Sequence, residues 1–269
     1  MATMLRFVDI DGFLRERFFS IVNVADTTTA TLKKELSDAI GRCDLHIPNM
    51  RGQGYDGARN MCGSWNGLQA IFLKDCSRAY YVNCFAHRLQ LALIAAAKKE
   101  VSIWLFFSKL NSICNLINAS LKRHAKLHSA QRNEIAHMVA IGERDTDRGC
   151  NQFRNLLRLK KTRWSSNFDS LCSMVDMYGS VITVLENMVD EGSSNSIRGE
   201  ASGLLIVMKS FDFIFILHLL QKIMGLTNLL CRALQERSLD ILNAMNHVSN
   251  TKILLHTLRE QGFDILLRT

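Results

Sequence analysis

The segment Arg51–Met61 reads RGQGYDGARNM and decides how the fold of this chain is interpreted. It places one carboxylate, Asp56, among three glycines, directly after a β-like run at Leu45–Met50. Glycine permits backbone conformations with positive φ and lets a large partner approach the main chain closely. A carboxylate between a strand and a helix can hold a hard divalent cation. It can equally cap the following helix, expected over Ala58–Cys76, and both interpretations of Asp56 stay open.

The composition predicts a folded intracellular protein with a sizeable core. The chain has 269 residues, 48% of them hydrophobic, and a single proline. This length suits one large domain or two smaller ones, and the scarcity of proline permits long helices. The N-terminus resembles neither a signal peptide nor a transit peptide. The most apolar stretch, Phe211–Leu220, is too short to span a membrane, so we expect a buried helix and no membrane association.

Charge and cysteine content narrow the classes of partner and compartment. The formal net charge is +8, from 33 basic and 25 acidic residues. A basic surface favours polyanions, with nucleic acid first and acidic membrane surfaces second. The eight cysteines form no CxxC pair. We therefore expect reduced, buried thiols rather than a disulfide framework.

Up to about residue 85 the sequence alternates between strand and helix patterns. Leu5–Ile10 and Phe13–Val24 read as two strands joined by an Asp-Gly hairpin turn. A helix capped within Thr27–Thr29 is expected to end at Gly41. The short apolar run Ala79–Phe85 is typical of a strand in a sheet covered on both faces.

Beyond residue 85 the periodicity predicts helices throughout. The fold class is therefore α/β plus all-α, with a mixed sheet and flanking helices followed by a helical region. The expected helices are Ala86–Lys99, Val101–Leu121, His124–Ile141, Phe168–Asp190, Ile197–Met224, Leu226–Glu236 and Leu239–Gly262.

A second informative segment, YYVNCFAHRLQL, spans Tyr80–Leu91 and places Cys84 three residues before His87. Both side chains could face one side of the first helical turn. A structural zinc site needs four ligands, and no second Cys/His pair accompanies this one. We expect Cys84 in the core and His87 at the rim of a polar cleft, where it would contact phosphate. An ordinary buried histidine and a zinc ligand remain the alternatives.

The third segment, RLKKTRWSS at Arg158–Ser166, concentrates positive charge beside an indole. Basic side chains neutralise phosphates, and an indole offers a face to an unstacked base. The alternative is a solvated loop. If the chain binds nucleic acid here, the contacts would come from Lys160, Lys161, Arg163 and Trp164.

Several enzyme classes are not supported by the sequence. It lacks the GxSxG motif of many serine hydrolases and the GxxxxGK[ST] loop of P-loop proteins. The glycines around Asp56 also lack the spacing of a dinucleotide-binding loop.

Taken together, these segments resemble the hAT-superfamily transposases. The resemblance is strongest to plant relatives named zinc finger MYM-type protein 1-like, which are described as TTF-type zinc-finger proteins with a hAT dimerisation domain. It extends over essentially the whole chain, and its most specific part pairs GQGYDGA with CFAHRLQLAL. The matching stretches are Arg15–Leu36, Arg51–Ala70, Tyr80–Leu93, Thr162–Leu171, Ser180–Glu186 and Leu217–Met245.

The resemblance implies a partial ribonuclease H-like core over residues 1–100 and an incomplete helical insertion region over residues 101–269. In that family three carboxylates hold Mg²⁺ or Mn²⁺ for DNA cleavage and joining, and the motif makes Asp56 the second of them. The family's CxxH pair corresponds to Cys84 and His87, and its RW pair to Arg163 and Trp164, which would handle bases near the cut. A nuclear location is also implied.

The resemblance also implies what lies outside this sequence. The family's first aspartate would precede Met1, leaving an unfilled strand position and an exposed sheet edge. The third carboxylate, a glutamate, and the dimerisation segment would follow Thr269, and no zinc finger is present in the sequence given. Arg59 stands where the family usually has a small polar residue.

We therefore expect a transposase-derived fragment that is catalytically inactive, holds no functional metal and retains affinity for DNA. Two alternatives remain open. One is a helical protein-interaction module of a domesticated transposase. The other is an active DNA transposase or nuclease completed by the missing segments.

Overall fold

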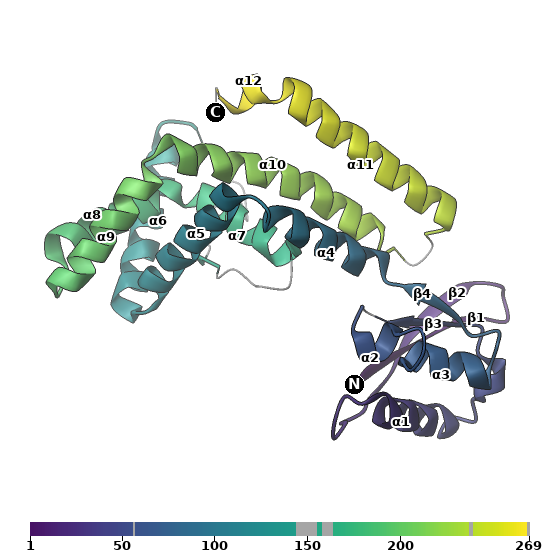
Figure 1. The fold of residues 1–269 in the computed structure, drawn as a ribbon. Coiled ribbons are helices and arrows are strands. Elements are labelled where there is room, and N and C mark those ends of the chain that lie inside the picture. The colour runs from purple at the N-terminus through teal and green to yellow at the C-terminus, as the bar shows by residue number, and fades with distance from the viewer. Residues whose placement is uncertain (56, 144–154, 158–163, 237–238, 268–269) are drawn as a thin grey trace. The chain divides into compact units, whose positions relative to one another are not determined.

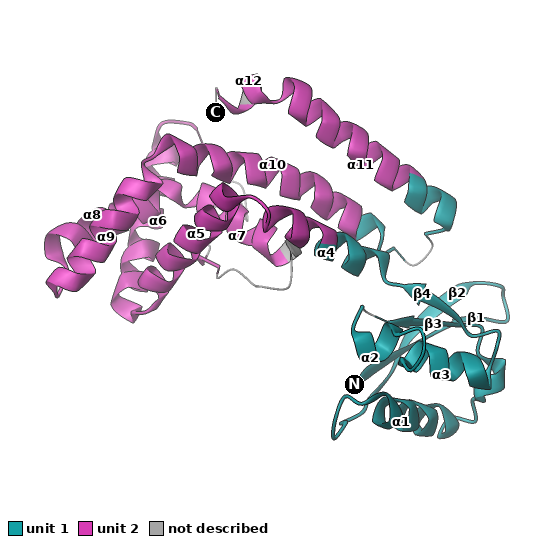
Figure 2. Ribbon diagram, in the orientation of Figure 1, with its two compact units in different colours: residues 1–91, 232–245 teal, residues 92–231, 246–269 magenta. Residues whose placement is uncertain are grey.

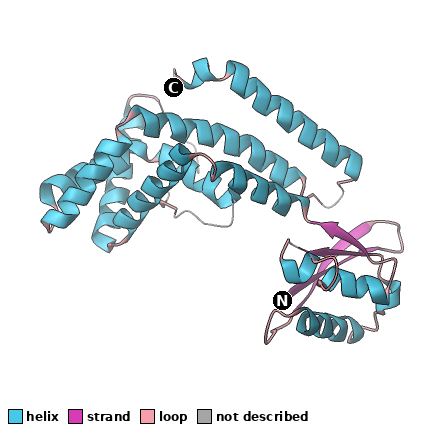
Figure 3. Cartoon of the chain, in the orientation of Figure 1, coloured by secondary structure: helices cyan, strands magenta, loops and turns pink. Residues whose placement is uncertain are grey.

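The computed structural model describes residues 1–55, 57–143, 155–157, 164–236 and 239–267 (Figure 1). The chain divides into two compact units (Figure 2). The first comprises residues 1–91 and 232–245, and the second residues 92–231 and 246–269. All strands of the described residues belong to the first unit, and the second unit is helical (Figure 3).

The hairpin expected at the N-terminus is confirmed. Strands β1 (Ala2–Val8) and β2 (Leu14–Ile21) pair antiparallel. The Asp9 carboxylate accepts backbone N–H bonds from residues 11 and 13, at 3.1 and 2.8 Å. Gly12 has φ +83°, a conformation that glycine adopts without steric penalty. The Arg15 guanidinium, 2.5 Å from Asp9, is the main cause of a lowered pKa for that carboxyl.

Helix α1 (Thr29–Gly41) also has the expected bounds. The side chain of Thr28 caps it by accepting the backbone N–H of Thr31. Its apolar stripe packs against helix α3 (Leu68–Asp75), because both helices bury their apolar sides in one small core. The buried members of this core are Leu32, Leu36, Ile40, Leu68 and Phe72.

The strand expected at Leu45–Met50 is wrong. A 3-10 helix occupies Ile47–Asn49, and the strand β3 follows it at Gly52–Tyr55. Pro48 explains the difference, since it has no N–H to donate to a ladder and its fixed φ suits the first turn of a helix. The strand thus begins inside the glycine-containing motif itself.

Strand β3 pairs in parallel with β4 (Tyr80–Asn83), in the register Gly52↔Tyr80 to Tyr55↔Asn83. This confirms the strand expected after residue 79. The glycines of β3 do not serve positive φ, because among the described glycines that conformation occurs at Gly12 and Gly142. A Cβ built on Gly52 would lie 3.6 Å from the Tyr80 carbonyl oxygen, which is an ordinary contact distance.

The sequence predicts a single mixed sheet covered on both faces, but the described residues do not form one. Strands β1–β2 and β3–β4 make two separate two-stranded sheets. Helices α1 and α3 lie on one side of the strands (Figure 1). In β4 the side chains of Tyr80 and Val82 are 69% and 53% exposed. An apolar run therefore did not mean burial on both faces.

The helix expected over Ala58–Cys76 is broken in two. Helix α2 (Arg59–Cys62) is a single turn, and a loop at residues 63–67 separates it from α3. The loop is closed by backbone bonds, from Gly63 N–H to Arg59 O and from Gly67 N–H to Gly63 O, both 3.0 Å. Glycine at both ends makes this turn possible in place of a continuous helix.

Helix α4 (Phe85–Ala97) continues from the first unit into the second, whose core is built from helices α5 to α10. These are α5 (Val101–Asn118), α6 (Leu121–Ala140), α7 (Trp164–Asp176), α8 (Tyr178–Glu191), α9 (Asn195–Met208) and α10 (Phe211–Ala233). Helices α11 (Ile241–Gln261) and α12 (Phe263–Leu266) follow.

Two of the expected long helices are interrupted. The helix expected over residues 168–190 bends by 72° between α7 and α8. At this bend α6 contributes Gln131, whose amide lies 2.8 Å from the sulfur of Met177, and Glu134, which accepts a hydrogen bond from Ser180. The helix expected over residues 197–224 breaks between α9 and α10, and α10 instead continues through the boundary expected at residues 225–226.

Helix α10 corrects the expectation about membrane-spanning length. By length and composition it could cross a membrane, with a mean hydropathy of 1.6 in its most apolar window, and the bent pair α7–α8 would pass as a broken span. One third of the α10 window is buried inside the structure. Its buried residues recur at helical spacing, which is typical of a core helix: Phe213, Leu217, Leu220, Met224, Thr227, Leu230 and Cys231.

Candidate nucleic-acid site at the ends of strands β3 and β4

The parallel pairing of β3 and β4 brings two sequence motifs to one sheet edge. Tyr55 and Asn83 are register partners at the ends of the two strands. The residues that follow them, Gly57 in one case and Cys84 to His87 in the other, therefore leave the sheet at the same edge. In open α/β sheets ligands bind outside the carboxyl ends of the strands. This edge is the natural candidate for a site.

His87 lies beside Gly57 at this edge. A Cβ built on Gly57 would lie 3.7 Å from His87 Cδ2 and 3.8 Å from His87 Nε2. The imidazole is half-buried, and Leu91, one turn further along α4, approaches the same Cβ position at 3.8 Å. His87 thus lies beside the residue that follows Asp56 in the sequence, and its expected place at the rim of a polar cleft stays a prediction.

Three hydrogen bonds fix the motif from β3 onward. Buried Gln53 donates from Nε2 to the carbonyl oxygens of Gln69 (3.0 Å) and Ala79 (2.8 Å), tying β3 to α3 and to the start of β4. Asn60 donates to the carbonyl of Thr27 at 2.6 Å, which ties α2 to the segment before α1. The loop that carries the motif therefore rests on three neighbouring elements.

Two further hydrogen bonds fix the turn after β3. The Cys62 thiol lies 3.4 Å from the Gly57 carbonyl oxygen and can donate to it. The hydroxyl of Thr29 donates to the Asn60 carbonyl at 3.1 Å. Together these contacts hold the backbone on the C-terminal side of Asp56 in a defined path.

Two tyrosines stack beneath this edge. The rings of Tyr55 and Tyr81 are 6.0 Å apart between centroids, with an interplanar angle of 25°. The Tyr81 hydroxyl donates to the amide oxygen of Asn83 at 2.9 Å. Burial raises the pKa of Tyr55, and the neighbouring Tyr81 raises it further. Tyr55 is thus a neutral, packed support for the turn that follows it.

Several of the predicted site residues lie outside the residues that the structure describes. Asp56, Lys160, Lys161 and Arg163 lie outside the described residues. Trp164 is the first residue of α7, and its side chain also lies outside the described part. Their assignments to metal and to nucleic acid stay predictions.

Cys84 is exposed, so its expected place in the core is wrong. It stands at the junction before α4, whereas Ala86 two residues later is buried. The general expectation of buried thiols holds for Cys76, Cys114 and Cys231 and is wrong also for Cys43. The described cysteines are free thiols.

The described residues at this edge do not by themselves form a site for Mg²⁺ or Mn²⁺. Such ions need several convergent oxygen ligands. Two of the oxygens here are already acceptors, the Asn83 amide oxygen from Tyr81 and the Gly57 carbonyl from Cys62. Among the described residues no group of three His, Cys, Asp or Glu side chains could hold a metal ion. We therefore derive no step through a metal.

Sequence reasoning missed the residues that support the site. Gln53 and Asn60 belong to the motif, but nothing in their spacing shows which carbonyl groups their amides would meet. A usable signal existed for Gln53, because it lies between two glycines in a strand and is the residue there whose side chain can pack inward.

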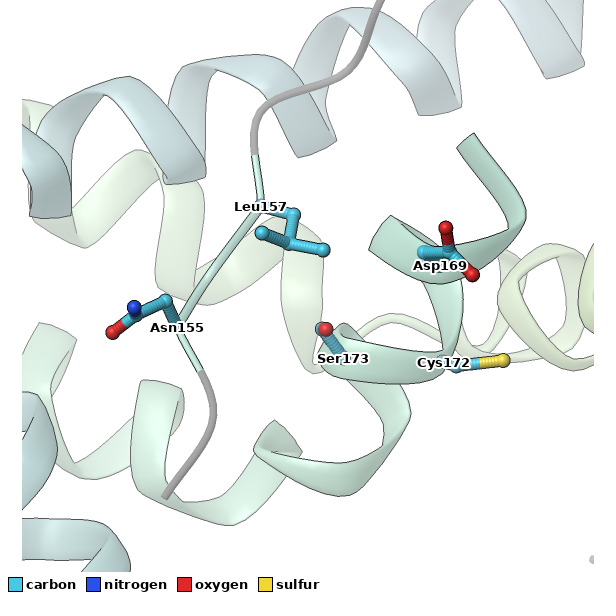
Figure 4. Close-up of a pocket in the computed structure, with 5 residues that line it drawn as sticks. All are labelled: Asn155, Leu157, Asp169, Cys172 and Ser173. Carbon is cyan, nitrogen blue, oxygen red and sulfur yellow. The ribbon is translucent and has the colours of Figure 1, made fainter. Parts of the chain in front are cut away.

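The second unit contains a separate hollow of about 310 Å³ beside α7 (Figure 4). Asp169, Cys172 and Ser173 line it from α7, opposite Asn155 and Leu157. Segment 155–157 is held to α5, since Asn118 donates to the Leu156 carbonyl at 3.0 Å. Residues on both sides of this segment lie outside the described part, so we assign the hollow no function.

Comparison with known families finds a match at the N-terminal end of the chain. Residues 1–67 match the model of the ZMYM1/FAM200 RNase-like domain (DUF4371). No solved structure matches the chain. The matched residues include the β1–β2 hairpin, α1, β3 and the whole GQGYDGA motif, and they fit an origin related to transposases. Residues 1–67 are therefore similar to the ZMYM1/FAM200 RNase-like domain.

Proposed function

We propose that this chain is a hAT-transposase-derived protein that binds DNA at the shared edge of strands β3 and β4 and does not cleave it by itself. The observation that carries the proposal is the position of His87 beside Gly57, where a Cβ built on the glycine would contact the imidazole ring. It brings the CxxH segment to the motif that holds Asp56, at the end of a parallel strand pair. The match of residues 1–67 to an RNase-like domain supports a nucleic-acid role for this edge.

The charges around the motif support DNA as the ligand. Arg51 and Arg59 are exposed on either side of β3, and Arg88 is exposed beside His87 in the first turns of α4. Between Asp56 and Asp75 the sequence contains no acidic residue. Guanidinium groups bind phosphate oxygens strongly, and a histidine can add a hydrogen bond to the same group. In this proposal Lys160, Lys161, Arg163 and Trp164 provide further DNA contacts.

Loss of cleavage is proposed because phosphoryl transfer needs convergent carboxylates to position the attacking and leaving oxygens. Three acidic residues of the first unit have partners of their own. Asp9 pairs with Arg15, Asp75 lies 2.7 Å from Lys33, and Asp26 accepts the Thr28 N–H at 2.8 Å. Each of these three carboxylates is thus already engaged in a contact within the first unit.

A binding and nicking experiment tests the proposal. A fluorescent DNA hairpin is titrated with the full chain over a series of salt concentrations. We expect binding that weakens steeply as salt rises, since contacts to phosphate release counterions. In the same samples Mg²⁺ or Mn²⁺ should produce no nicks. Nicking that Asp56→Asn abolishes would contradict the loss of cleavage, and absence of binding at low salt would contradict the DNA role.

A protein-interaction role is the second candidate, and α11 favours it. Along its 21 residues Ala244 is the one described as buried, while apolar side chains such as Leu242, Met245 and Ile253 are 69%, 63% and 62% exposed. Exposed apolar surface of this extent marks interaction sites. If this role holds, Ile253→Glu should reduce self-association in sedimentation experiments and leave DNA binding unchanged. If the wild type and Ile253→Glu sediment equally, the result would argue against the interaction role.

A further inference from the structure

The loop between α2 and α3, residues 63–67 with the sequence GSWNG, presents an aromatic ring to solvent. Trp65 at its centre is 84% exposed. Tryptophan is usually largely buried in folded proteins, because its large apolar surface is costly to hydrate. An indole held in water so near the GQGYDGA motif therefore calls for a function.

The loop is closed tightly at its base. A Cβ built on Gly67 would overlap the backbone of Gly63, and one built on Gly63 would lie 2.8 Å from the Arg59 carbonyl oxygen. The side chain of Gln69 reaches back and donates to the carbonyl oxygens of Cys62 (3.2 Å) and Gly63 (3.5 Å). The backbone that carries Trp65 is thus held by α2 and α3, so little conformational entropy is lost when the ring is covered.

The residues around Trp65 favour a negatively charged partner that also has a flat apolar face. Ser64 and Asn66 flank the indole and are exposed, as is Arg59 in the preceding turn. An acidic residue occurs neither in the loop nor in the helices beside it until Asp75. An unpaired base on a phosphate backbone fits this combination, because its π face can stack on the indole while its phosphates attract the arginine.

We propose that Trp65 is a stacking platform for an unpaired base of DNA bound at the β3–β4 edge. The proposal rests on the proposed function, since it needs DNA at that edge. It assigns Trp65 a role separate from that of Trp164: Trp65 belongs to the RNase-like unit and is fixed by its own glycine-closed loop.

The test compares Trp65→Ala and Trp65→Phe with the wild-type chain in binding to labelled single-stranded oligothymidine. Trp104→Ala is the matched control, because Trp104 is also exposed (59%) but lies on α5. Circular dichroism confirms that each variant is folded. Stacking of one base contributes about 1–3 kcal/mol, so Trp65→Ala should bind about five- to 150-fold more weakly. Trp65→Phe should recover part of this loss, and Trp104→Ala should stay within about twofold of the wild type.

Two further readouts separate stacking from charge. The salt dependence of binding should have the same slope in Trp65→Ala as in the wild type, because no phosphate contact is removed. The Trp65→Ala variant should bind duplex DNA of equal length almost as tightly as the wild type does. A folded Trp65→Ala variant that binds single strands as tightly as the wild type would overturn the stacking role and leave the proposed function intact. A wild-type chain that binds no DNA at low salt would overturn both.

Discussion

The imidazole of His87 lies beside Gly57, close enough that a Cβ built on the glycine would contact the ring. The two residues come after the parallel strands β3 and β4, whose register partners are 28 residues apart in the sequence. The space between Gly57 and the ring is limited. At 3.7 and 3.8 Å a Cβ on Gly57 would make an ordinary contact with the ring, whereas a larger side chain would displace it. This relationship links the two motifs on which the proposed site depends.

Substitutions at Gly57 should therefore depend on size. Gly57→Ala should leave stability and DNA affinity within about twofold of the wild type, because its φ is not in the left-handed region and the added methyl group has room. Gly57→Val should push His87 away and weaken DNA binding by about tenfold, through loss of a charge-assisted hydrogen bond. Fluorescence anisotropy measures both. Equal losses for alanine and valine would show that glycine is needed for another reason.

Gln53 should be important for the stability of the first unit. In Gln53→Ala the buried carbonyl group of Ala79 and the partly buried carbonyl group of Gln69 lose their side-chain donor. An unsatisfied buried group costs about 1–3 kcal/mol, so the free energy of unfolding should fall by that order. Urea denaturation followed by circular dichroism measures the change. Gln261→Ala is the control, because Gln261 is exposed on α11, and a similar loss in both variants would contradict the role of Gln53.

The bend between α7 and α8 should depend on Glu134. Its carboxylate accepts a hydrogen bond from Ser180 in the first turn of α8, where negative charge stabilises a helix. A Cβ on Gly179 would lie 2.5 Å from Glu134 Oε1, so Gly179→Ala should displace the carboxylate and lower the stability by about 1 kcal/mol.

A double-mutant cycle makes this coupling measurable. In a Glu134→Ala background the same Gly179→Ala change should become neutral or stabilising, since alanine favours helix by about 1 kcal/mol over glycine. Gly199→Ala in α9 is the control, because nothing lies within 4 Å of its Cβ position. Additive effects of the two substitutions would rule out the contact.

Tyr55 should make the folded state sensitive to alkaline pH. Burial raises the pKa of Tyr55, so above about pH 10 the unfolded chain releases the phenolic proton while the folded chain keeps it. The unfolded state then binds fewer protons, and stability falls as pH rises, by up to about 1.4 kcal/mol per pH unit. Tyr55→Phe should reduce this fall between pH 10 and 12. Urea midpoints across that range measure it, with exposed Tyr80→Phe as control; identical pH profiles for wild type and Tyr55→Phe would be evidence against burial of the phenol.

The parts of the fold that could be predicted are those encoded locally. The Asp-Gly turn and the cap at Thr28 act within a few residues, so their positions were correct. The strand at Gly52–Tyr55 could not be located from local preference, because two glycines weaken a strand unless a partner strand approaches closely. The break at residue 177 depends on side chains of α6 more than 40 residues earlier in the sequence.

The sequence motifs of the site could be predicted, whereas the residues that support these motifs could not. Both motifs could be recognised in the sequence, but their approach at one sheet edge follows from the parallel pairing of β3 and β4, which local patterns did not specify. The exposure of Cys84 could not be predicted either, since cysteine among apolar neighbours is usually buried. The closed loop around Trp65 was also missed, because a helical pattern across residues 58–76 concealed the close approach of Gly63 and Gly67.

The affinity of His87→Ala for a DNA hairpin at low salt tests the central claim most directly. His256→Ala serves as the control, because His256 is exposed on α11. If the β3–β4 edge binds DNA, a folded His87→Ala variant should bind about tenfold more weakly than the wild type, and His256→Ala should bind equally well. Unchanged affinity in a folded His87→Ala variant would contradict the claim that this edge is the DNA site.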